Sequence, residues 1–460
     1  MFLKVPGPGE AAIAPMRPAM ASPGGFLRRL RILGVALLPL LLVLACSKHK
    51  DTASDPGKPP AITTAPADAS TVTGRSVSFS VTATGEITLR YQWNKDGVDI
   101  LGAIGSTYTI FSPKMQDAGK YAVTITNPNG KITSTAATLT VAQALIFSAP
   151  MGLATDATGN TYVSDMDDHT IWKVSATNQK TLLAGASGLP GAVDAKGGAA
   201  RFNTPGGLAL DASGNLLVAD TGNHTIRSIA PDGTVTTLAG SAGQVGSDDG
   251  NGPAARFNSP FGLAVGSGGS VYISDTQNHT IRLLAPNGDV TTFAGLAGKP
   301  GQVDGPRASA QFNQPNGLAL ASNGTLYVAD YGNSVIRAIS ASGTVSLLAG
   351  QYAAHGLADG TGTGALLYQP LGISLDASGN LYVADSANHT IRRVTSAGAV
   401  SVVAGSATLG NADSTGASAQ FFLPCGVAVN AAGNVVVADT NNHMLRSLTP
   451  AGVVTTPTAP

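Results

Sequence analysis

Residues 205–227 read Pro205-Gly-Gly-Leu-Ala-Leu-Asp-Ala-Ser-Gly-Asn-Leu-Leu-Val-Ala-Asp220-Thr-Gly-Asn-His224-Thr-Ile-Arg227, and this phrase decides the fold because the chain repeats it. Six copies follow one another at steps of 55, 55, 55, 55 and 54 residues, the first of them divergent, and they begin at Pro150, Pro205, Pro260, Pro315, Pro370 and Pro424. A unit of this length cannot bury its apolar face alone, so it must stack on its neighbours. The sequence therefore predicts a repeat architecture over residues 143–460.

Each copy contains four short stretches with the pattern of β-strands. Two apolar stretches flank the turn Ala-Ser-Gly-Asn, residues 225–229 alternate as a third strand, and residues 234–238 follow as a fourth. Four antiparallel strands repeated radially make a propeller blade. The wording Gly-Asn-Leu-Tyr-Val-Ala-Asp with Asn-His-Thr-Ile-Arg resembles the NHL family of propellers, and the six copies imply six blades. The fourth strand of the last copy is cut short at Pro457, so we expect residues 144–147 to help close the ring.

Composition favours an all-β protein without a charged partner. Charged residues make up 12% of the chain and glycine occurs 57 times, which favours short strands joined by tight turns. Lys plus Arg and Asp plus Glu are equal at 27 each, so no net field attracts nucleic acid, and we predict no nucleic-acid partner. The two cysteines, Cys46 and Cys425, do not form a disulfide framework.

The N-terminal segment has the features of an export signal. Arg28, Arg29 and Arg31 precede an apolar run over residues 32–45, which is too short to cross a bilayer as a helix and is typical of a signal peptide. Val43-Leu-Ala-Cys46 resembles the lipobox of bacterial lipoproteins, which implies lipidation of Cys46, and Ser47 in place of Asp implies the outer membrane. An ordinary signal peptide with a chance cysteine is the alternative. We thus expect a signal peptide over 1–45 and a polar, Pro-rich flexible tether over 46–60.

Residues 61–142 are expected to form a β-sandwich. Strand patterns occur over 77–83, 89–93, 107–110 and 133–141, with Asn129-Gly130 as a hairpin turn. Trp93 together with Asp117-Ala-Gly-Lys-Tyr121 resembles the immunoglobulin family, which implies a core tryptophan and a tyrosine corner. Val81 and Val123 stand where that family often carries its bridging cysteines. A spacer role is favoured over ligand binding for this domain.

The second strand of every copy ends in an aspartate, and a histidine follows four residues later in five copies. A ring of such residues suggests a metal site. However, because these side chains recur in every blade, they are better explained by a structural role that every blade shares, which is to cap its own turn. We therefore interpret these residues as structural and predict no metal site. They are Asp165, Asp220, Asp275, Asp330, Asp385 and Asp439, with His169, His224, His279, His389 and His443.

The connections between copies carry a second aspartate and an aromatic residue. The aspartates lack the closely spaced carboxylates of a Ca²⁺ site and are interpreted as Asp-Gly turns. The aromatic positions are Phe202, Phe257, Phe312, Tyr368 and Phe421, and the aspartates are Asp194, Asp249, Asp304, Asp359 and Asp413. The repeated arginines are expected to form an outward polar row, and they are Arg227, Arg282, Arg337, Arg392 and Arg446.

Positions where the copies disagree are better candidates for ligand binding, because a ligand without six-fold symmetry needs unlike contacts around a ring. Trp172, Tyr331 and His355 are such departures and are the candidate binding residues, with sequence drift as the alternative. Cys425, beside an inner strand, is expected to be buried.

We predict an exported, lipid-anchored cell-envelope protein whose propeller binds a protein, peptide or glycan. No catalytic residue and no cofactor are predicted, because the inner strands carry no inward Glu or His and no Gly-x-Ser-x-Gly elbow occurs. The alternative is a metal-dependent lyase or hydrolase with its site in the central channel, of the gluconolactonase, strictosidine synthase-like or amidating lyase type. A purely structural envelope component is a third possibility.

Overall fold

The computed structural model describes residues 57–86 and 88–460, so the expected signal peptide, most of the expected tether and Cys46 lie outside the described part. The described part of the chain is all-β apart from single 3₁₀ turns, as the sequence predicts. It contains one β-sandwich followed by six blade-like sheets. No helix among the described residues is long and apolar enough to span a membrane.

The sandwich consists of ten strands. β1 pairs with β4, β3 pairs with β7, and the other strands form one sheet in the order β2-β10-β8-β5-β6, in which β9 pairs with β8. The expected strand over 133–141 is confirmed from residue 137 onward, as β10, whereas Thr133 ends β9, which pairs with β8 as a hairpin. The elements are β1 (Ala61–Thr64), β2 (Ala69–Val72), β3 (Val77–Ser80), β4 (Thr82–Thr84), β5 (Arg90–Lys95), β6 (Val98–Asp99), β7 (Thr107–Ile110), η1 (Met115–Asp117), β8 (Gly119–Asn127), β9 (Gly130–Thr133) and β10 (Ala137–Ala142).

The sandwich core has the two features that the sequence predicts. The Trp93 side chain is fully buried, and its indole N–H donates to the Gly105 carbonyl at 2.9 Å. The Tyr121 hydroxyl donates to the Asp117 carbonyl at 2.7 Å, which is the tyrosine corner. Val81 and Val123 are buried in the same cluster, so apolar packing joins the sheets where a disulfide could otherwise stand.

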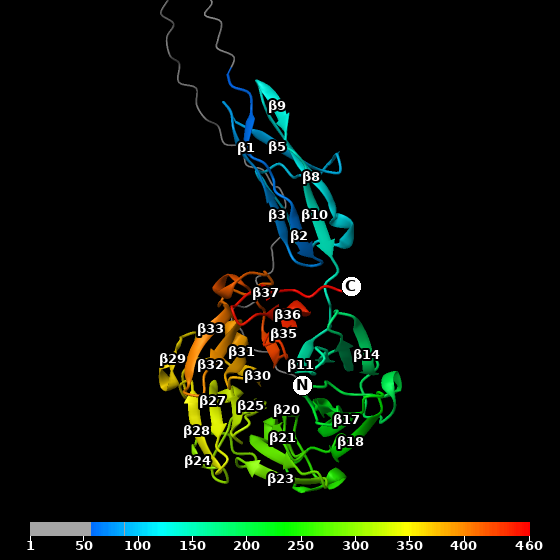
Figure 1. The fold of residues 1–460 in the computed structure, drawn as a ribbon, viewed down its shortest axis with the longest axis vertical. Helices are drawn as coiled ribbons and strands as arrows, with labels where there is room; N and C mark the ends of the chain where they lie inside the picture. The colour runs from blue at the N-terminus through cyan, green and yellow to red at the C-terminus, as the bar shows by residue number, and fades with distance from the viewer. Residues whose placement is uncertain (1–56, 87) are drawn as a thin grey trace, which may run out of the picture. The chain divides into compact units, whose positions relative to one another are not determined.

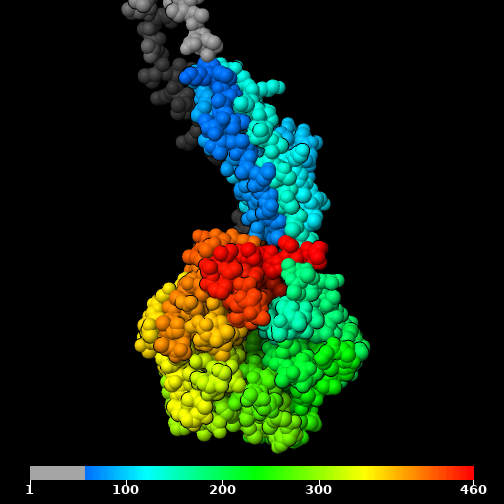
Figure 2. Space-filling model, in the orientation of Figure 1, coloured from blue at the N-terminus to red at the C-terminus, as the bar shows by residue number. Residues whose placement is uncertain are grey.

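Six antiparallel sheets follow one another around a central axis, from green to red in Figure 1. The space-filling view shows them as wedges around a central hollow (Figure 2). The strands of the first three blades are β11 (Pro150–Thr155), β12 (Thr161–Asp165), β13 (Thr170–Val174) and β14 (Lys180–Gly185); β15 (Leu208–Leu210), β16 (Leu216–Asp220), β17 (Thr225–Ile229) and β18 (Val235–Gly240); β20 (Pro260–Val265), β21 (Val271–Asp275), β22 (Thr280–Leu284) and β23 (Asp289–Ala294).

The last three blades repeat this order, but the final outer strand has only two residues. Their strands are β25 (Pro315–Leu320), β26 (Leu326–Asp330), β27 (Val335–Ile339) and β28 (Thr344–Ala349); β30 (Pro370–Leu375), β31 (Leu381–Asp385), β32 (Thr390–Val394) and β33 (Ala399–Gly405); β34 (Pro424–Val429), β35 (Val435–Asp439), β36 (Met444–Leu448) and β37 (Val454–Thr455).

Three blades gain a fifth, two-residue strand that the sequence pattern does not predict. It comes from the connection that precedes the blade and pairs with the blade's outermost strand. These strands are β19 (Gly250–Asn251), β24 (Gly305–Pro306) and β29 (Gly360–Thr361). Short 3₁₀ turns lie in four connections and in five turns between second and third strands: η2 (Gly197–Ala199), η4 (Gly252–Ala254), η7 (Gly362–Gly364) and η9 (Gly416–Ser418); η3 (Thr221–Asn223), η5 (Thr276–Asn278), η6 (Tyr331–Asn333), η8 (Ser386–Asn388) and η10 (Thr440–Asn442).

The ring closes between the first and last blades. Ile146 forms a β-bridge with Met444, and the Phe147 N–H donates to the His443 carbonyl at 2.9 Å, so this segment continues the outer strand that β37 leaves short. Leu145 and Phe147 are buried with residues of both blades. The expectation that residues 144–147 help close the ring is confirmed.

Each of blades 2 to 6 is held by a buried arginine, and the expected outward row of arginines is wrong. Arg392, for example, has no exposed side-chain surface and contacts Asp385 and Asp359 at 2.9 and 2.8 Å. The aspartate in the connection thus reaches the third strand of the next blade instead of forming an isolated turn. The same contacts recur at Arg227, Arg282, Arg337 and Arg446.

A buried ring covers the guanidinium in four of these blades. The distances from the Arg carbon Cζ to the ring centroids of Phe202, Phe257, Phe312 and Phe421 lie between 5.0 and 5.2 Å. In blade 5 the residue at this position is Leu367. The expectation that Tyr368 is the equivalent of these phenylalanines is therefore wrong by one residue. The register is fixed by the proline that starts each inner strand, three residues after the ring.

The repeated histidines join neighbouring blades. Nδ1 of His224 accepts the backbone N–H of Ser259 at 3.0 Å, and the same bond recurs at His169, His279 and His389. Burial lowers the pKa of His224, His279 and His389, which favours the neutral ring that can accept this bond. Ser334 makes the equivalent bond through its hydroxyl.

We predict that Arg392→Met destabilises the propeller by about 3–5 kcal/mol, because it leaves Asp385 buried without a counter-charge. Burial already raises the pKa of Asp385 to about 6, although Asn388, the Tyr368 N–H and Arg392 favour its ionised form. Loss of Arg392 raises it further. A carboxyl whose pKa is higher in the folded than in the unfolded protein stabilises the folded state most at pH values below its unfolded pKa, and this stabilisation is lost as the pH rises. The destabilisation caused by Arg392→Met is therefore expected to grow from pH 5 to pH 8.

Urea denaturation at both pH values measures this effect. Arg393→Met is the matched control, since Arg393 is exposed on the same strand, and its effect is expected to stay within about 0.5 kcal/mol. Adding Asp385→Asn to Arg392→Met is expected to remove the extra pH dependence. Equal destabilisation by the two arginine changes would contradict the assignment.

We also predict that Phe147→Ala costs about 3–5 kcal/mol, because its buried ring joins both ends of the propeller. Limited proteolysis should then release the C-terminal blade earlier than in the unchanged protein. Ile146→Ala is the control, since that neighbouring side chain is 49% exposed. A Phe147→Ala protein as stable as Ile146→Ala would show that the ring closes without this contact.

Candidate functional site

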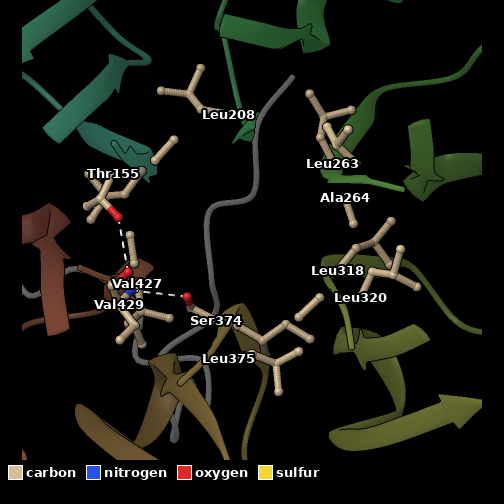
Figure 3. A pocket seen from close by; sticks show the side chains of 16 residues that line it. Thr155, Leu208, Leu263, Ala264, Leu318, Leu320, Ser374, Leu375, Val427 and Val429 are labelled. Carbon is tan, nitrogen blue, oxygen red and sulfur yellow. Dashed lines mark hydrogen bonds between the residues drawn. The ribbon is translucent and has the colours of Figure 1, made fainter. Parts of the chain in front are cut away.

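The central channel is apolar. The first strands of all six blades line a cavity of about 260 Å³ with Leu, Ile, Ala and Val side chains (Figure 3). Its two polar side chains are engaged across the blades: the Thr155 hydroxyl donates to the Val429 carbonyl at 3.0 Å, and Ser374 accepts the Val429 N–H at 3.1 Å. Among the described residues, the lining of this cavity contains no carboxylate, imidazole or thiol.

The repeated aspartates and histidines do not converge on a shared centre. Each aspartate lies inside its own blade and each histidine lies at a seam, where they make the contacts described above. In blade 1, which lacks the arginine, burial raises the pKa of Asp165, and its carboxylate accepts the N–H groups of Ser148 and Ala149. No group of three or more His, Cys, Asp or Glu side chains suited to a metal ion occurs among residues 57–86 and 88–460.

Two sets of loops share one face of the propeller, which we call the turn face: the turns between second and third strands and the connections between blades. The Asn223 side chain in a turn donates to the Gly191 carbonyl in a connection at 2.6 Å, and Asn278, Asn333, Asn388 and Asn442 do the same. Loops that a rigid scaffold holds in place often carry binding residues, so the turn face is the candidate binding surface.

Tyr331 occupies a position on the turn face where most other blades have a Thr or Ser that bonds to the next blade. In four blades the first turn residue donates its hydroxyl to the carbonyl of the proline that starts the next blade, as Thr276 does to Pro315 at 2.8 Å. Tyr331 occupies this place in blade 4 and is 5% exposed, and burial raises its pKa to about 12.

His355 and Tyr368 form an exposed aromatic pair on the turn face. Their rings stack with centroids 4.2 Å apart, His355 is exposed and Tyr368 is half-buried. At the next seam Phe422 meets His389 edge-on at 5.8 Å. We call Tyr331, His355, Tyr368 and Phe422 the aromatic corner. Tyr331 is buried, whereas His355, Tyr368 and Phe422 are exposed or part exposed and are held by neighbouring rings, which suits recognition of peptides or sugars.

Trp172 does not belong to this group. It lies on β13 of blade 1, at the position that the buried arginine holds elsewhere, whereas Tyr331 and His355 belong to blade 4 and the connection after it. Lys180 Nζ lies 4.0 Å from the ring centroids of both Trp172 and Phe147 and donates to the Ile146 carbonyl at 2.7 Å. Trp172 thus stands where other blades have the arginine, with Lys180 against its ring, and it lies in a different blade from Tyr331 and His355.

Two cysteines were singled out from the sequence. Cys425 is buried, and burial raises the pKa of its thiol to about 11, so it is not an activated nucleophile. Cys46, the expected lipidation site, lies outside the described residues.

Tyr368 is the residue of the aromatic corner that sequence reasoning misplaced. Counting back two residues from the proline of each inner strand aligns Tyr368 and Phe422 with Asn203, Asn258 and Asn313. That alignment would have shown two consecutive copies in which an aromatic residue replaces asparagine.

Family models match both parts of the chain. An immunoglobulin domain matches residues 59–127, and NHL repeats match 202–227, 257–282, 312–338, 367–394 and 423–446. The first, divergent blade lies outside these five matches.

Curated relatives share the repeat region over part of their length. The chain is 33% identical over 315 residues to Protein SUPPRESSOR OF QUENCHING 1, chloroplastic, of Arabidopsis thaliana, covering 65% of this chain and 30% of that protein. It is 32% identical over 321 residues to NHL repeat-containing protein 2 of Homo sapiens, covering 62% and 44%. The chain therefore spans less than half the length of these relatives.

Solved structures share the fold at low identity. A structural genomics protein of unknown function from Bacteroides thetaiotaomicron VPI-5482 aligns with a TM-score of 0.51 at 17% identity, covering 85% of this chain and 98% of that one. An auxiliary nutrient binding protein from the same organism aligns with a TM-score of 0.50 at 14% identity, with the same coverage. The protein thus joins an immunoglobulin domain to a six-bladed propeller of NHL repeats.

Proposed function

We propose that this protein is exported, held at the outer membrane by lipid on Cys46, and binds a protein, peptide or glycan through the turn face of its propeller. The observation that carries the binding proposal is the exposed His355–Tyr368 stack. It is absent from the equivalent positions of the other blades, where Pro300 and Asn313 stand in the preceding repeat. A ligand without six-fold symmetry requires such a local difference.

The chemistry of the channel supports binding in preference to catalysis there. Its walls are aliphatic, and its two polar side chains are used in contacts across blades. A structural neighbour described as an auxiliary nutrient binding protein has the same overall fold, which is compatible with a binding role. The immunoglobulin domain then serves as a spacer between the anchor and the propeller.

The export proposal rests on the sequence of the first 46 residues. A basic segment, a 14-residue apolar run and Val43-Leu-Ala-Cys46 occur in the order that lipoprotein signals require. Several acyl chains contribute about 0.8 kcal/mol per buried CH₂, which is enough for stable attachment.

We predict that Cys46→Ser abolishes labelling by radioactive palmitate in a Gram-negative host and moves the protein from the membrane pellet to the soluble fraction. Cys425→Ser is the matched control, because Cys425 is the other cysteine of the chain and is buried in the propeller. Labelled Cys46→Ser protein, or unlabelled wild-type protein, would contradict the anchor.

The binding proposal predicts that the full chain, applied to arrays of peptides and of glycans, gives specific signals that the double variant His355→Ala, Tyr368→Asn weakens about ten-fold or more. Asparagine is the residue of other repeats at position 368, so the fold is expected to persist. Pro300→Ala, at the position equivalent to His355 in the preceding connection, should leave the signals unchanged. Signals that resist the double variant would exclude the aromatic corner.

A further inference from the structure

A second pocket lies at the seam where the ring closes, between blades 6 and 1. Its volume is about 320 Å³, larger than that of the central cavity, and it is lined by the second strands of both blades together with residues of the closing segment. We call it the seam pocket. It lies beside turns that contain Gly159, Asn178 and Asn430, at the ends of the blades away from the turn face, so it is separate from the aromatic corner.

The seam pocket exists because one pair of facing residues differs from its equivalents. At the other seams, a tyrosine or leucine of one blade packs toward a leucine or valine of the next, as Tyr382 does toward Val435. At the closing seam the equivalent pair is Val436 and Thr161. Valine lacks the aromatic ring that four other blades place there, at Tyr162, Tyr272, Tyr327 and Tyr382. The missing volume is the pocket.

Thr161 adds a polar group at the floor of the pocket. The equivalent residues in the other five blades are all leucine or valine. Thr161 is 7% exposed and lines the pocket, so its side chain borders the open space. A hydroxyl both donates and accepts hydrogen bonds, which the leucine or valine of the other blades cannot do. The substitution therefore favours a polar occupant.

Asn178 is a third departure at the same place. Its equivalents in the other five blades are all glycine with positive φ: Gly233, Gly288, Gly343, Gly398 and Gly452. Asn178 keeps the left-handed conformation, with φ 64°, and adds a side-chain amide to the lining of the pocket. Asparagine tolerates this conformation better than most residues but gains nothing in the turn itself.

The chemistry of the walls defines the ligand class. No charged side chain lines the pocket, and its hydroxyl and amide groups stand beside aliphatic surfaces from Leu145, Val174 and Leu445. Ser, Thr and Asn side chains both donate and accept hydrogen bonds, which matches hydroxyl groups. The volume lies at the lower end of ligand pockets, which run from about 300 to 1,000 Å³. We propose that the seam pocket binds one ring of a neutral sugar, with its C–H face on the aliphatic wall and its hydroxyls on Thr161 and Asn178.

Saturation-transfer NMR and titration calorimetry on the full chain test this proposal, with D-glucose, D-galactose, D-mannose and N-acetyl-D-glucosamine as probes and D-glucuronate as a charged comparison. We expect at least one neutral sugar to bind and glucuronate to bind more weakly. Val436→Tyr restores the residue of four other blades and fills the pocket. It should therefore abolish binding and raise the melting temperature of the sugar-free protein.

Leu217→Tyr is the matched control, because it makes the same change at the equivalent position of blade 2 and should leave sugar binding intact. Thr161→Val removes the floor hydroxyl at nearly constant volume and should weaken binding about three- to ten-fold even if the tyrosine variant folds poorly. The proposal is overturned if none of the four neutral sugars binds at millimolar concentration, or if Val436→Tyr and Thr161→Val both bind like the wild type. The double change in the aromatic corner should not affect this binding, so the two proposals fail separately.

Discussion

A fully buried arginine between two carboxylates is the contact on which the propeller depends. Each of blades 2 to 6 places this guanidinium on its third strand, between the aspartate that ends its second strand and an aspartate from the preceding connection. A buried charge is tolerated when it is paired with an opposite charge, and each guanidinium pairs with both carboxylates through its two terminal nitrogens, although Nε of four of the five arginines has no partner among the described residues. The contact therefore fixes both the blade and the long connection before it. The connections that build the turn face are held in place by this requirement.

The closing seam departs from this pattern because it joins the two ends of the repeat array. Blade 1 has no preceding connection to supply an aspartate, and it carries Trp172 and Lys180 in place of the arginine network. Blade 6 has a two-residue outer strand, which residues 144–147 extend. Terminal units of a repeat array lose the contacts that inner units share. Their residues are thus free to differ, and the seam pocket lies where they do.

We propose that ligand binding in this fold depends on departures from the repeat. The channel shows almost none, since all six blades line it with aliphatic residues. The turn face shows them on consecutive blades, where Tyr331, His355, Tyr368 and Phe422 replace smaller or polar residues. Three departures from the repeat, at Thr161, Asn178 and Val436, lie together in the seam pocket. These two places have different chemistry, since one offers exposed rings and the other an uncharged, partly buried cavity.

The sequence by itself determined the number of blades and the strand pattern of each blade, because periodic patterns report local structure directly. The tyrosine corner followed from the resemblance to the immunoglobulin family, and the closing role of residues 144–147 followed from the short last strand. Only the tertiary structure decided where the repeated polar residues point. Arg392 and Asp359 are 33 positions apart, and nothing in either local pattern shows that they meet, so the arginines were expected on the outside. The same holds for Thr161 and Val436, which stand at opposite ends of the repeat array. Ring closure brings them together, and a contact that closure creates leaves no trace in the neighbouring sequence.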